Sequence, residues 1–202
     1  MKTHSLLAGG MILLATCAAA QSKIVISAEG GSPDDRGSAR VLYWNDTANT
    51  AAGEFAFNYG RPVWKKIYEA PAKFDAMTKG HVWRMGSNFW TELQTELPLE
   101  IAGKSVPVGA YFLGLHRSAD GAEWSLAFID PAKVLENRGD AFEIQKAPIE
   151  FEAPMTVAKA DGIADKLTIT LSYPKQDPKS VTLLVHWGNL ALTAPIKVTL
   201  AD

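Results

Sequence analysis

The amino-acid sequence predicts an all-β protein, a single-domain antiparallel β-sandwich or flattened barrel with one short helix. Short runs rich in Val, Ile, Tyr, Phe and Trp recur along the chain, which is the composition of β-strands. Gly, Pro, Asn and Asp separate these runs, as tight turns require. A parallel α/β sheet would need crossovers of about a dozen residues or more between its strands. About ten short strands at this spacing therefore favour a sandwich or a barrel.

The expected strands are spread over the chain after its first twenty residues. They are Lys23–Ser27, Arg40–Trp44, Glu54–Asn58, Val63–Tyr68, Leu93–Ile101, Tyr111–His116, Trp124–Ile129, Phe142–Phe151, Leu167–Ser172, Val181–Trp187 and Ile196–Leu200. Strand residues alternate between faces, so the odd-numbered positions of Val181–Trp187 form the expected core face. Trp, Leu and Phe at the even-numbered positions of Trp124–Ile129 likewise share one side. Asp120-Gly121 is the clearest hairpin turn, because Gly accepts positive φ without strain.

One segment has the pattern of a helix. Asp130 can cap it, Pro131 fits its first position, and Gly139 can end it, with Val134 and Leu135 facing inward. Residues 70–80 lack strand alternation, which predicts a loop or a short helical turn. With one good candidate, less than about a tenth of the residues should be helical, against roughly a third in typical globular proteins.

The first twenty residues have the pattern of a secretory signal peptide. Met1-Lys2 supplies a positive start, Ser5–Thr16 is uncharged and apolar, and Ala18-Ala19-Ala20 provides the small residues of a cleavage site. Residues 1–20 are therefore expected to be removed, which leaves a single β domain over 21–202. The apolar run of about a dozen residues is shorter than the roughly 20 needed to cross a bilayer. No transmembrane segment is expected in the mature chain.

Cys17 offers a second way of processing the chain. Leu14-Ala15-Thr16-Cys17 is similar to a lipoprotein box, in which the cysteine is acylated, although Thr16 is unusual before the cysteine. Cleavage after Ala20 predicts a periplasmic or secreted protein, whereas acylation predicts a lipid anchor through Cys17. Cleavage after Ala20 also leaves no cysteine, which excludes disulfides and thiol catalysis.

Composition and motifs exclude several classes of function. The chain has 20 Lys and Arg against 22 Asp and Glu, interspersed throughout, so no nucleic-acid partner is expected. No nucleophile elbow, phosphate loop or zinc-protease motif is present, and no cofactor is predicted. His81, His116 and His186 lack close ligand spacing, so no metal site is expected either.

The strongest candidate binding surface combines two segments, residues 58–62 and 81–88. The candidate ligand-binding residues are Tyr59, Arg61, Trp83, Arg84 and Asn88. Tyr and Trp offer flat apolar faces with one polar end, and Arg offers a planar fork for carboxylates or phosphates. In the alternative interpretation, Trp83 anchors the core and Arg84 closes a buried ion pair.

Five motifs in order resemble a bacterial family of exported β domains, known as domain of unknown function twenty-nine eleven. The motifs are Tyr59-Gly60-Arg61-Pro62, Val82-Trp83-Arg84-Met85-Gly86-Ser87-Asn88, Pro107-Val108-Gly109-Ala110-Tyr111, Glu123-Trp124 and Leu183-Leu184-Val185-His186-Trp187. The resemblance covers about residues 32–198. The chain departs from the family pattern at Lys65–Tyr68 and in the run from there to Lys79, where the family has a Gly-Arg pair and a Phe-Gly. It departs again at Ser87, where the family has Ala. The resemblance implies an exported β domain and no reaction.

Two functions remain open. The first is a non-catalytic module that binds a glycan, a peptide or an envelope partner through the candidate residues. The second is a hydrolase or lyase on an extracellular or envelope polymer, with a carboxylate such as Glu92 or Glu123. A deep cleft that places Arg84 beside a second titratable group would favour the enzyme, and a shallow aromatic surface would favour binding.

Overall fold

The structure of the chain is a computed structural model that describes residues 35–200. The expected signal peptide and the expected strand Lys23–Ser27 lie outside the described residues. None of the helices between residues 35 and 200 is long and apolar enough to cross a membrane.

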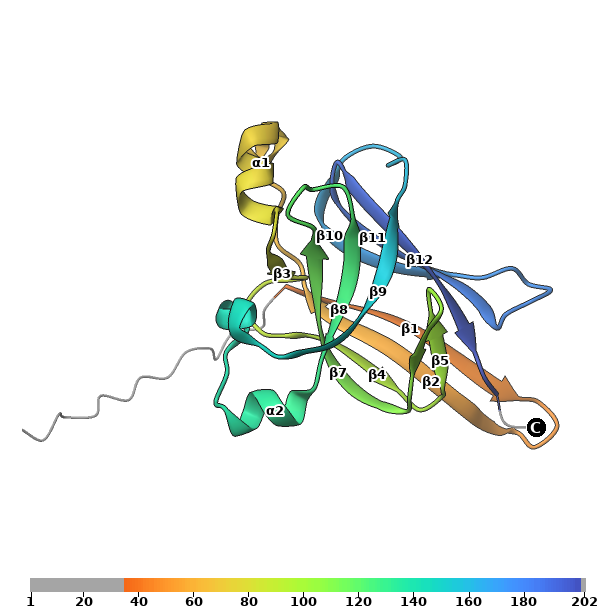
Figure 1. Cartoon of the computed structure of the whole chain (residues 1–202). Coiled ribbons are helices and arrows are strands. Elements are labelled where there is room, and N and C mark those ends of the chain that lie inside the picture. The colour runs from red at the N-terminus through yellow and green to blue at the C-terminus, as the bar shows by residue number, and fades with distance from the viewer. Residues whose placement is uncertain (1–34, 201–202) are drawn as a thin grey trace, which may run out of the picture. The chain divides into compact units, whose positions relative to one another are not determined.

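Antiparallel strands make up most of the described chain (Figure 1). They are β1 (Arg36–Asn45), β2 (Thr50–Gly60), β3 (Val82–Arg84), β4 (Thr91–Thr95), β5 (Leu99–Ile101), β6 (Lys104–Val106), β7 (Gly109–Arg117), β8 (Trp124–Ile129), β9 (Ile149–Val157), β10 (Ala164–Ser172), β11 (Ser180–Gly188) and β12 (Leu190–Val198). The main path of the sheet runs β1-β2-β4-β7-β8-β9-β12-β11-β10, while β3 pairs with β7 and β5 joins β12 to β6. The predicted all-β antiparallel fold is confirmed.

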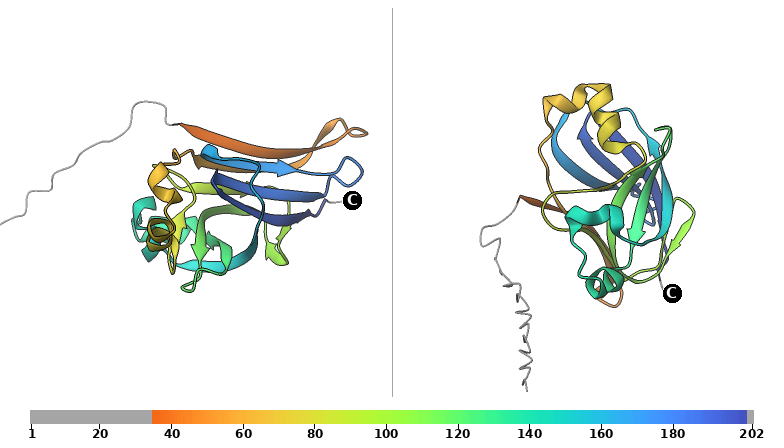
Figure 2. Two further views of the ribbon diagram at one scale, coloured as in Figure 1. Left: turned by 90° about the horizontal axis from the view of Figure 1, so that it is seen from above. Right: turned by 60° about the vertical axis from the view of Figure 1, so that its left-hand side comes forward.

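The sheet folds over on itself, so that its two ends meet (Figure 2). Between β9 and β12 the ladder contains only the pairs Thr156–Thr193 and Val157–Leu192, which marks the fold line. On the opposite side, the segment after β2 hydrogen-bonds to β10. The Trp64 amide donates to the Asp165 carbonyl at 2.7 Å, and the Leu167 amide donates to the Pro62 carbonyl at 3.1 Å. Side chains from both layers fill the space between them.

The expected core faces are confirmed. The odd-numbered residues of Val181–Trp187 are at most 3% exposed, and Trp124, Leu126 and Phe128 are at most 5% exposed. Ile129, on the opposite side of β8, is also fully buried. It belongs to a second small cluster with Val82, Ala127, Val134 and Ile144, under the helices that cover the outer face.

Two α-helices and two 3-10 helices flank the sheet. They are η1 (Lys66–Glu69), α1 (Pro71–Thr78), α2 (Pro131–Glu136) and η2 (Ala141–Lys146). The expected helix after Asp130 is confirmed as α2, because the Asp130 carboxylate accepts a hydrogen bond from the Ala132 amide and Pro131 lies in the first turn. The inward face holds for Val134 but is wrong for Leu135, which is 73% exposed. The helical share of 14% exceeds the expected tenth, mainly because η1 and η2 were not predicted and because α1 forms where a loop or a short helical turn was expected.

Three expected strands differ from the structure. In Val63–Tyr68 only Val63 forms a β-bridge, and η1 follows. The first half of Phe142–Phe151 is η2, where the Asp140 side chain caps the Phe142 amide, and β9 begins only at Ile149. Leu93–Ile101 is divided into β4 and β5, since Pro98 has no amide hydrogen with which to continue a ladder. The predicted turn at Asp120-Gly121 is present, with φ of +81° at Gly121.

Candidate functional site

Tyr59, the first candidate residue, lies in the core at 3% exposure. Its hydroxyl oxygen accepts a hydrogen bond from the Ile169 amide at 2.9 Å. The side chain therefore links β2 to β10 across the line where the two ends of the sheet meet. Tyr59 therefore has a structural contact within the core, and its hydroxyl oxygen already has a hydrogen-bond partner.

Arg61 follows on the same line between β2 and β10. Its Nε donates to the Leu167 carbonyl at 3.4 Å, and its Nη1 lies 3.6 Å from Asp35 Oδ1. Asp35 also pairs with Lys166. The hydrogen bond from Lys166 and the positive charges of Lys166 and Arg61 lower the pKa of the Asp35 carboxyl, against a smaller effect of burial. Arg61 thus lies in a group of exposed and half-exposed ion pairs.

Trp83 and Arg84, on β3, face different surroundings. The Trp83 indole stacks on Trp187, with ring centroids 4.7 Å apart and an interplanar angle of 20°. The Arg84 guanidinium lies 3.8 Å from the centroid of Phe142, and its Nη1 donates to the Asn88 carbonyl at 2.9 Å. Partial burial lowers the pKa of Arg84, while the charge of Asp140 opposes that change.

A cavity of about 180 Å³ lies beside Trp83 and Arg84, which both line it. Tyr59, Arg61 and Asn88 do not line it. Its other walls come from Met77, Val82, Ala141, Phe142, Ile144 and Gln145, without a carboxylate or imidazole. No described carboxylate lies within ion-pair distance of Arg84, so the expected alternative of a closed ion pair has no partner here.

A different hollow gathers the aromatic chemistry expected of the binding surface. This aromatic hollow has a volume of about 320 Å³ and lies between η1, α1 and the turn from β11 to β12. It is lined by Trp64, Tyr68, Glu69, Pro71, Phe74, Asp75, Arg117, Asn189 and Leu190. The indole of Trp64 makes an edge contact with Tyr68 at 5.4 Å and a tilted contact with Phe74 at 6.1 Å.

Trp64 packs against Trp187 and Gly188. The Trp64 and Trp187 rings meet edge to face at 4.9 Å, and the Trp187 indole nitrogen donates to the Pro62 carbonyl at 2.9 Å. The Trp64 indole nitrogen is buried without a hydrogen-bond partner in the described chain. The rings of Tyr68, Phe74 and Trp187 all contact the Trp64 indole.

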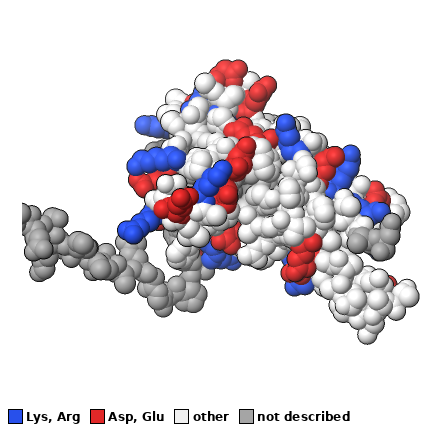
Figure 3. Space-filling model, turned by 60° about the horizontal axis from the view of Figure 1, so that its bottom comes forward, with Lys and Arg blue, Asp and Glu red and all other residues white. Residues whose placement is uncertain are grey.

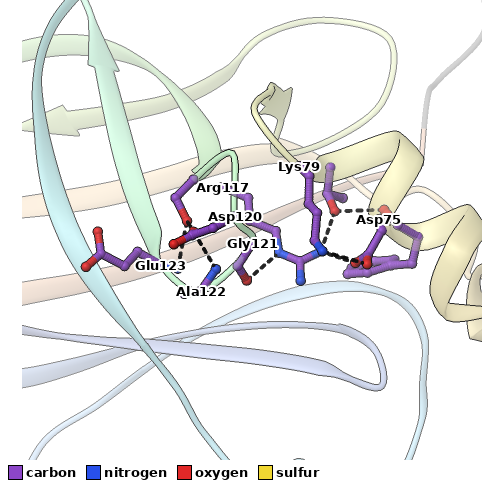
Figure 4. Close-up of polar contacts among 10 residues, drawn as sticks. Asp75, Lys79, Arg117, Asp120, Gly121, Ala122 and Glu123 are labelled. Atoms are coloured by element: carbon purple, nitrogen blue, oxygen red, sulfur yellow. Dashed lines mark hydrogen bonds and ion pairs between the residues drawn. The ribbon is translucent and has the colours of Figure 1, made fainter.

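Arg117 lines the aromatic hollow, and Figure 4 shows its polar contacts with Asp75 and Gly121. Its Nη1 donates to Asp75 Oδ1 at 2.7 Å and to Thr78 Oγ1 at 2.9 Å, and its Nε donates to the Gly121 carbonyl at 3.0 Å. Its guanidinium also lies 5.8 Å from the Phe74 ring centroid. Only 14% of the Arg117 side chain is exposed. Arg117 therefore holds Asp75 in place and presents little of its own surface to a ligand.

Asp75 is one of the charged residues that line the aromatic hollow. Hydrogen bonds from Lys79 and Arg117, in that order, lower the pKa of its carboxyl. Its side chain remains 37% exposed, with Lys79 Nζ at 2.9 Å from Oδ2. At the rim, the Asp75 carboxylate can accept hydrogen bonds from a ligand. The exposed Asn189 amide can both donate and accept them.

The histidines lie apart. His81 is exposed, His116 contacts Glu152, and His186 Nε2 lies 3.1 Å from the Gly188 carbonyl. Within residues 35–200, no three His, Cys, Asp or Glu side chains are grouped closely enough to hold a metal ion. Charges of both signs are interspersed on the face in Figure 3, where the projecting end at the lower right carries few of them.

Comparison with known families decides the classification. The family model described as a protein of unknown function, DUF2911, matches residues 45–196. The chain belongs to the DUF2911 family. No curated protein and no solved structure matches the chain.

The structure shows how two DUF2911 motifs of this chain fit together. A Cβ on Gly60, in Tyr59–Pro62, would fall 2.1 Å from the Ser87 carbonyl oxygen in Val82–Asn88. The two segments therefore touch through backbone atoms, which explains a glycine at position 60. Trp83 of the second motif stacks on Trp187 of the closing motif. These motif residues join β2, β3 and β11 behind the aromatic hollow.

Sequence reasoning missed most of the aromatic hollow. Tyr68 lies where this chain departs from the family pattern, and Trp64 directly precedes that departure. Phe74 and Asp75 lie in the segment expected to be a loop or a short helical turn. A helical reading of Pro71–Thr78 would have placed Phe74, Asp75 and Thr78 on adjacent faces. The hydrogen bonds of Arg117 to Asp75 and Thr78 join positions 42 and 39 residues apart, a pairing that one sequence does not reveal.

Proposed function

We propose that this DUF2911 protein is an exported module whose aromatic hollow binds a neutral saccharide unit without catalysing a reaction on it. The observation that carries the proposal is the combination of the Trp64, Tyr68 and Phe74 rings with the Asp75 carboxylate and the Asn189 amide. A sugar ring presents apolar C–H faces that pack on aromatic rings. Its hydroxyl groups donate to carboxylates and exchange hydrogen bonds with amides.

The dimensions and charge of the hollow favour a small neutral unit. A volume of about 320 Å³ lies at the lower end of ligand pockets, which run from roughly 300 to 1,000 Å³. Arg117 is already engaged by Asp75, Thr78 and Gly121, so it offers little to an anionic ligand. Asp75 and Glu69 at the rim would repel anions further.

The candidate residues on β3, Trp83 and Arg84, lie outside the aromatic hollow, and Trp83 contributes to it only through Trp187. Trp83 supports Trp187, which supports Trp64, and Arg84 with Phe142 forms a separate aromatic surface. The cavity beside Arg84 is small and has no second titratable group in its lining. A second titratable group beside Arg84 in a deep cleft would have favoured an enzyme. Its absence from the lining favours binding over hydrolase or lyase chemistry at Arg84.

A glycan array probed with the protein tests the proposal. We expect capture of neutral saccharides, and at least about tenfold weaker binding by Tyr68→Ala and by Asn189→Ala, which corresponds to about 1.4 kcal/mol each. Tyr173→Ala is the matched control, because Tyr173 is 49% exposed and follows the far end of β10. Capture of peptides instead of glycans, or equal glycan binding by all variants, would overturn the proposal.

Export is tested by the intact mass of the protein recovered from its natural host. The small residues at Ala18 and Ala20 support a chain that begins at Gln21. A mass with a diacylglyceryl group on Cys17 would instead indicate a membrane-anchored lipoprotein. A chain that keeps Met1 would contradict export by either route.

A further inference from the structure

A cavity larger than the aromatic hollow lies elsewhere on the described chain. It is a groove of about 540 Å³ lined by His116 on β7, Ser125 on β8 and Pro154 and Thr156 on β9, with Glu123 beside the β7–β8 turn. His116 pairs with Ser125 across the strands, so both side chains share one face. That face is the outer one, opposite to the core side of Trp124.

A chain of hydrogen bonds crosses this outer groove. His116 Nδ1 lies 2.7 Å from Glu152 Oε1, and Ser125 Oγ donates to Glu152 Oε2 at 2.6 Å. Both carboxylate oxygens are thus engaged, which fixes the position of Glu152 relative to the imidazole. His116 and Glu152 are each 33% exposed, so the pair is half-buried and still open to the groove.

We propose that His116 is a general base that activates water in the outer groove for the hydrolysis of neutral esters. In a neutral imidazole, one nitrogen donates and the other accepts a hydrogen bond. Glu152 Oε1 lies 2.7 Å from Nδ1, so a neutral ring that donates to it carries its proton on Nδ1 and presents the lone pair of Nε2. Within residues 35–200, His116 Nε2 has no hydrogen-bond partner, whereas His186 Nε2 contacts the Gly188 carbonyl.

Water is the nucleophile in this arrangement. Ser125 Oγ donates its hydrogen to Glu152 rather than to His116, so it is not activated for attack. The water oxygen bonds to the ester carbonyl carbon while its proton passes to His116 Nε2. The tetrahedral intermediate then breaks the bond to the alkoxy oxygen, which takes the proton from Nε2. A carboxylic acid and an alcohol leave, and no further reactant is required.

The charges of the outer groove determine the substrate class. Glu123 and Glu152 contribute two carboxylates, and no Lys or Arg lines the groove. Anionic esters such as phosphate esters would be repelled, while neutral acyl esters would not. Glu152 is a positioning residue for His116, and Ser125 holds Glu152 in place.

Hydrolysis of p-nitrophenyl acetate by the full chain tests this proposal. We expect His116→Ala to lower the protein-catalysed rate by about 100-fold or more, the usual contribution of general-base catalysis. Added imidazole should restore part of that rate. His81→Ala, which removes an exposed histidine outside the groove, should keep the wild-type rate. Equal rates for wild type and His116→Ala would overturn the proposal.

Nitrogen-15 NMR of the imidazoles provides a readout that does not depend on turnover. We expect His116 to show the Nδ1-protonated tautomer in the wild type and a shift toward the Nε2-protonated tautomer in Glu152→Gln, together with a lower rate. A wild-type His116 protonated on Nε2 alone would refute the proposal. Tyr68→Ala and Asn189→Ala should keep the esterase rate, so this test and the glycan test fail independently.

Discussion

Trp64 lies directly over Gly188, where a Cβ would fall 2.0 Å from the indole Cδ2. Gly188 also has φ of +59°, a left-handed conformation that L side chains rarely adopt. The end of β11 therefore approaches the indole more closely than any other residue type would permit. This contact seats Trp64 against Trp187 and makes it the central wall of the aromatic hollow.

Gly188→Ala should displace Trp64 and destabilise the fold. Gly103→Ala is a matched control, because Gly103 has φ of +80° but nothing within 4 Å of its absent Cβ. Both variants carry backbone strain, and only Gly188→Ala adds overpacking, which costs about 1–3 kcal/mol. Urea unfolding should show an excess loss of that size at position 188. Equal losses in the two variants would contradict the contact with Trp64.

Tyr59→Phe should weaken the join between β2 and β10. The change leaves the buried Ile169 amide without its acceptor, at a cost of about 1–3 kcal/mol. Tyr111→Phe is the control, since the Tyr111 hydroxyl donates to the Pro107 carbonyl at 3.0 Å in an exposed position. Its loss should stay within about 0.5 kcal/mol. Similar free energies of unfolding for both variants would argue against the join.

The all-β class and several core faces could be predicted because alternation is a local property of the sequence. Val181–Trp187 shows this, since its odd-numbered residues are all buried. The helix at Pro131 was also predictable, because Asp130 supplies its cap from an adjacent position. The outward turn of Leu135 was not, since it depends on what covers α2 rather than on α2 itself.

The candidate site was harder to predict because it depends on contacts between distant segments. Tyr59 has the chemistry of a ligand contact, but its hydroxyl meets Ile169, 110 residues later. Trp64 belongs to an expected strand that ends after one bridge, where the chain turns into η1. Which aromatic rings face solvent is decided by how the sheet folds over, and a single sequence does not encode that as a visible pattern.

Tyr43 should make stability depend on alkaline pH. Burial, followed by the nearby Tyr173 and Asp177, raises the pKa of the Tyr43 hydroxyl from 10.0 to about 12. In the unfolded chain the phenol ionises near its ordinary value, so the stabilisation is complete below about pH 10. The stabilisation is lost as the pH rises from about 10 through about 12. In that range the phenol of the unfolded chain is ionised while that of the folded chain still holds its proton.

The measurement for Tyr43 is urea unfolding at several pH values between 9 and 12. Lysines titrate in the same range, so the difference between wild type and Tyr43→Phe isolates the contribution of the phenol. We expect that difference to shrink as pH rises. The variant also lacks the hydrogen bond from Tyr43 to the Pro178 carbonyl, 2.7 Å long, which lowers its stability below pH 10. A difference that is constant with pH would contradict the raised pKa.

Arg84→Ala distinguishes a stacked guanidinium from a buried ion pair. Removing one partner of a buried pair costs about 3–5 kcal/mol, because the other charge is left uncompensated. Arg84 instead stacks on Phe142, which is 69% exposed, and donates to the Asn88 carbonyl. The loss should therefore be about 1–2 kcal/mol by urea unfolding.

Two further variants define what Arg84 contributes. Arg84→Lys keeps the charge but loses the planar group that stacks on Phe142, so it should recover only part of the lost stability. Arg40→Ala removes an exposed arginine that pairs with Glu54 and should cost no more than about 1 kcal/mol. A loss above about 3 kcal/mol for Arg84→Ala would require a carboxylate partner for its guanidinium. Full recovery by Arg84→Lys would show that charge, and not stacking on Phe142, holds this surface together.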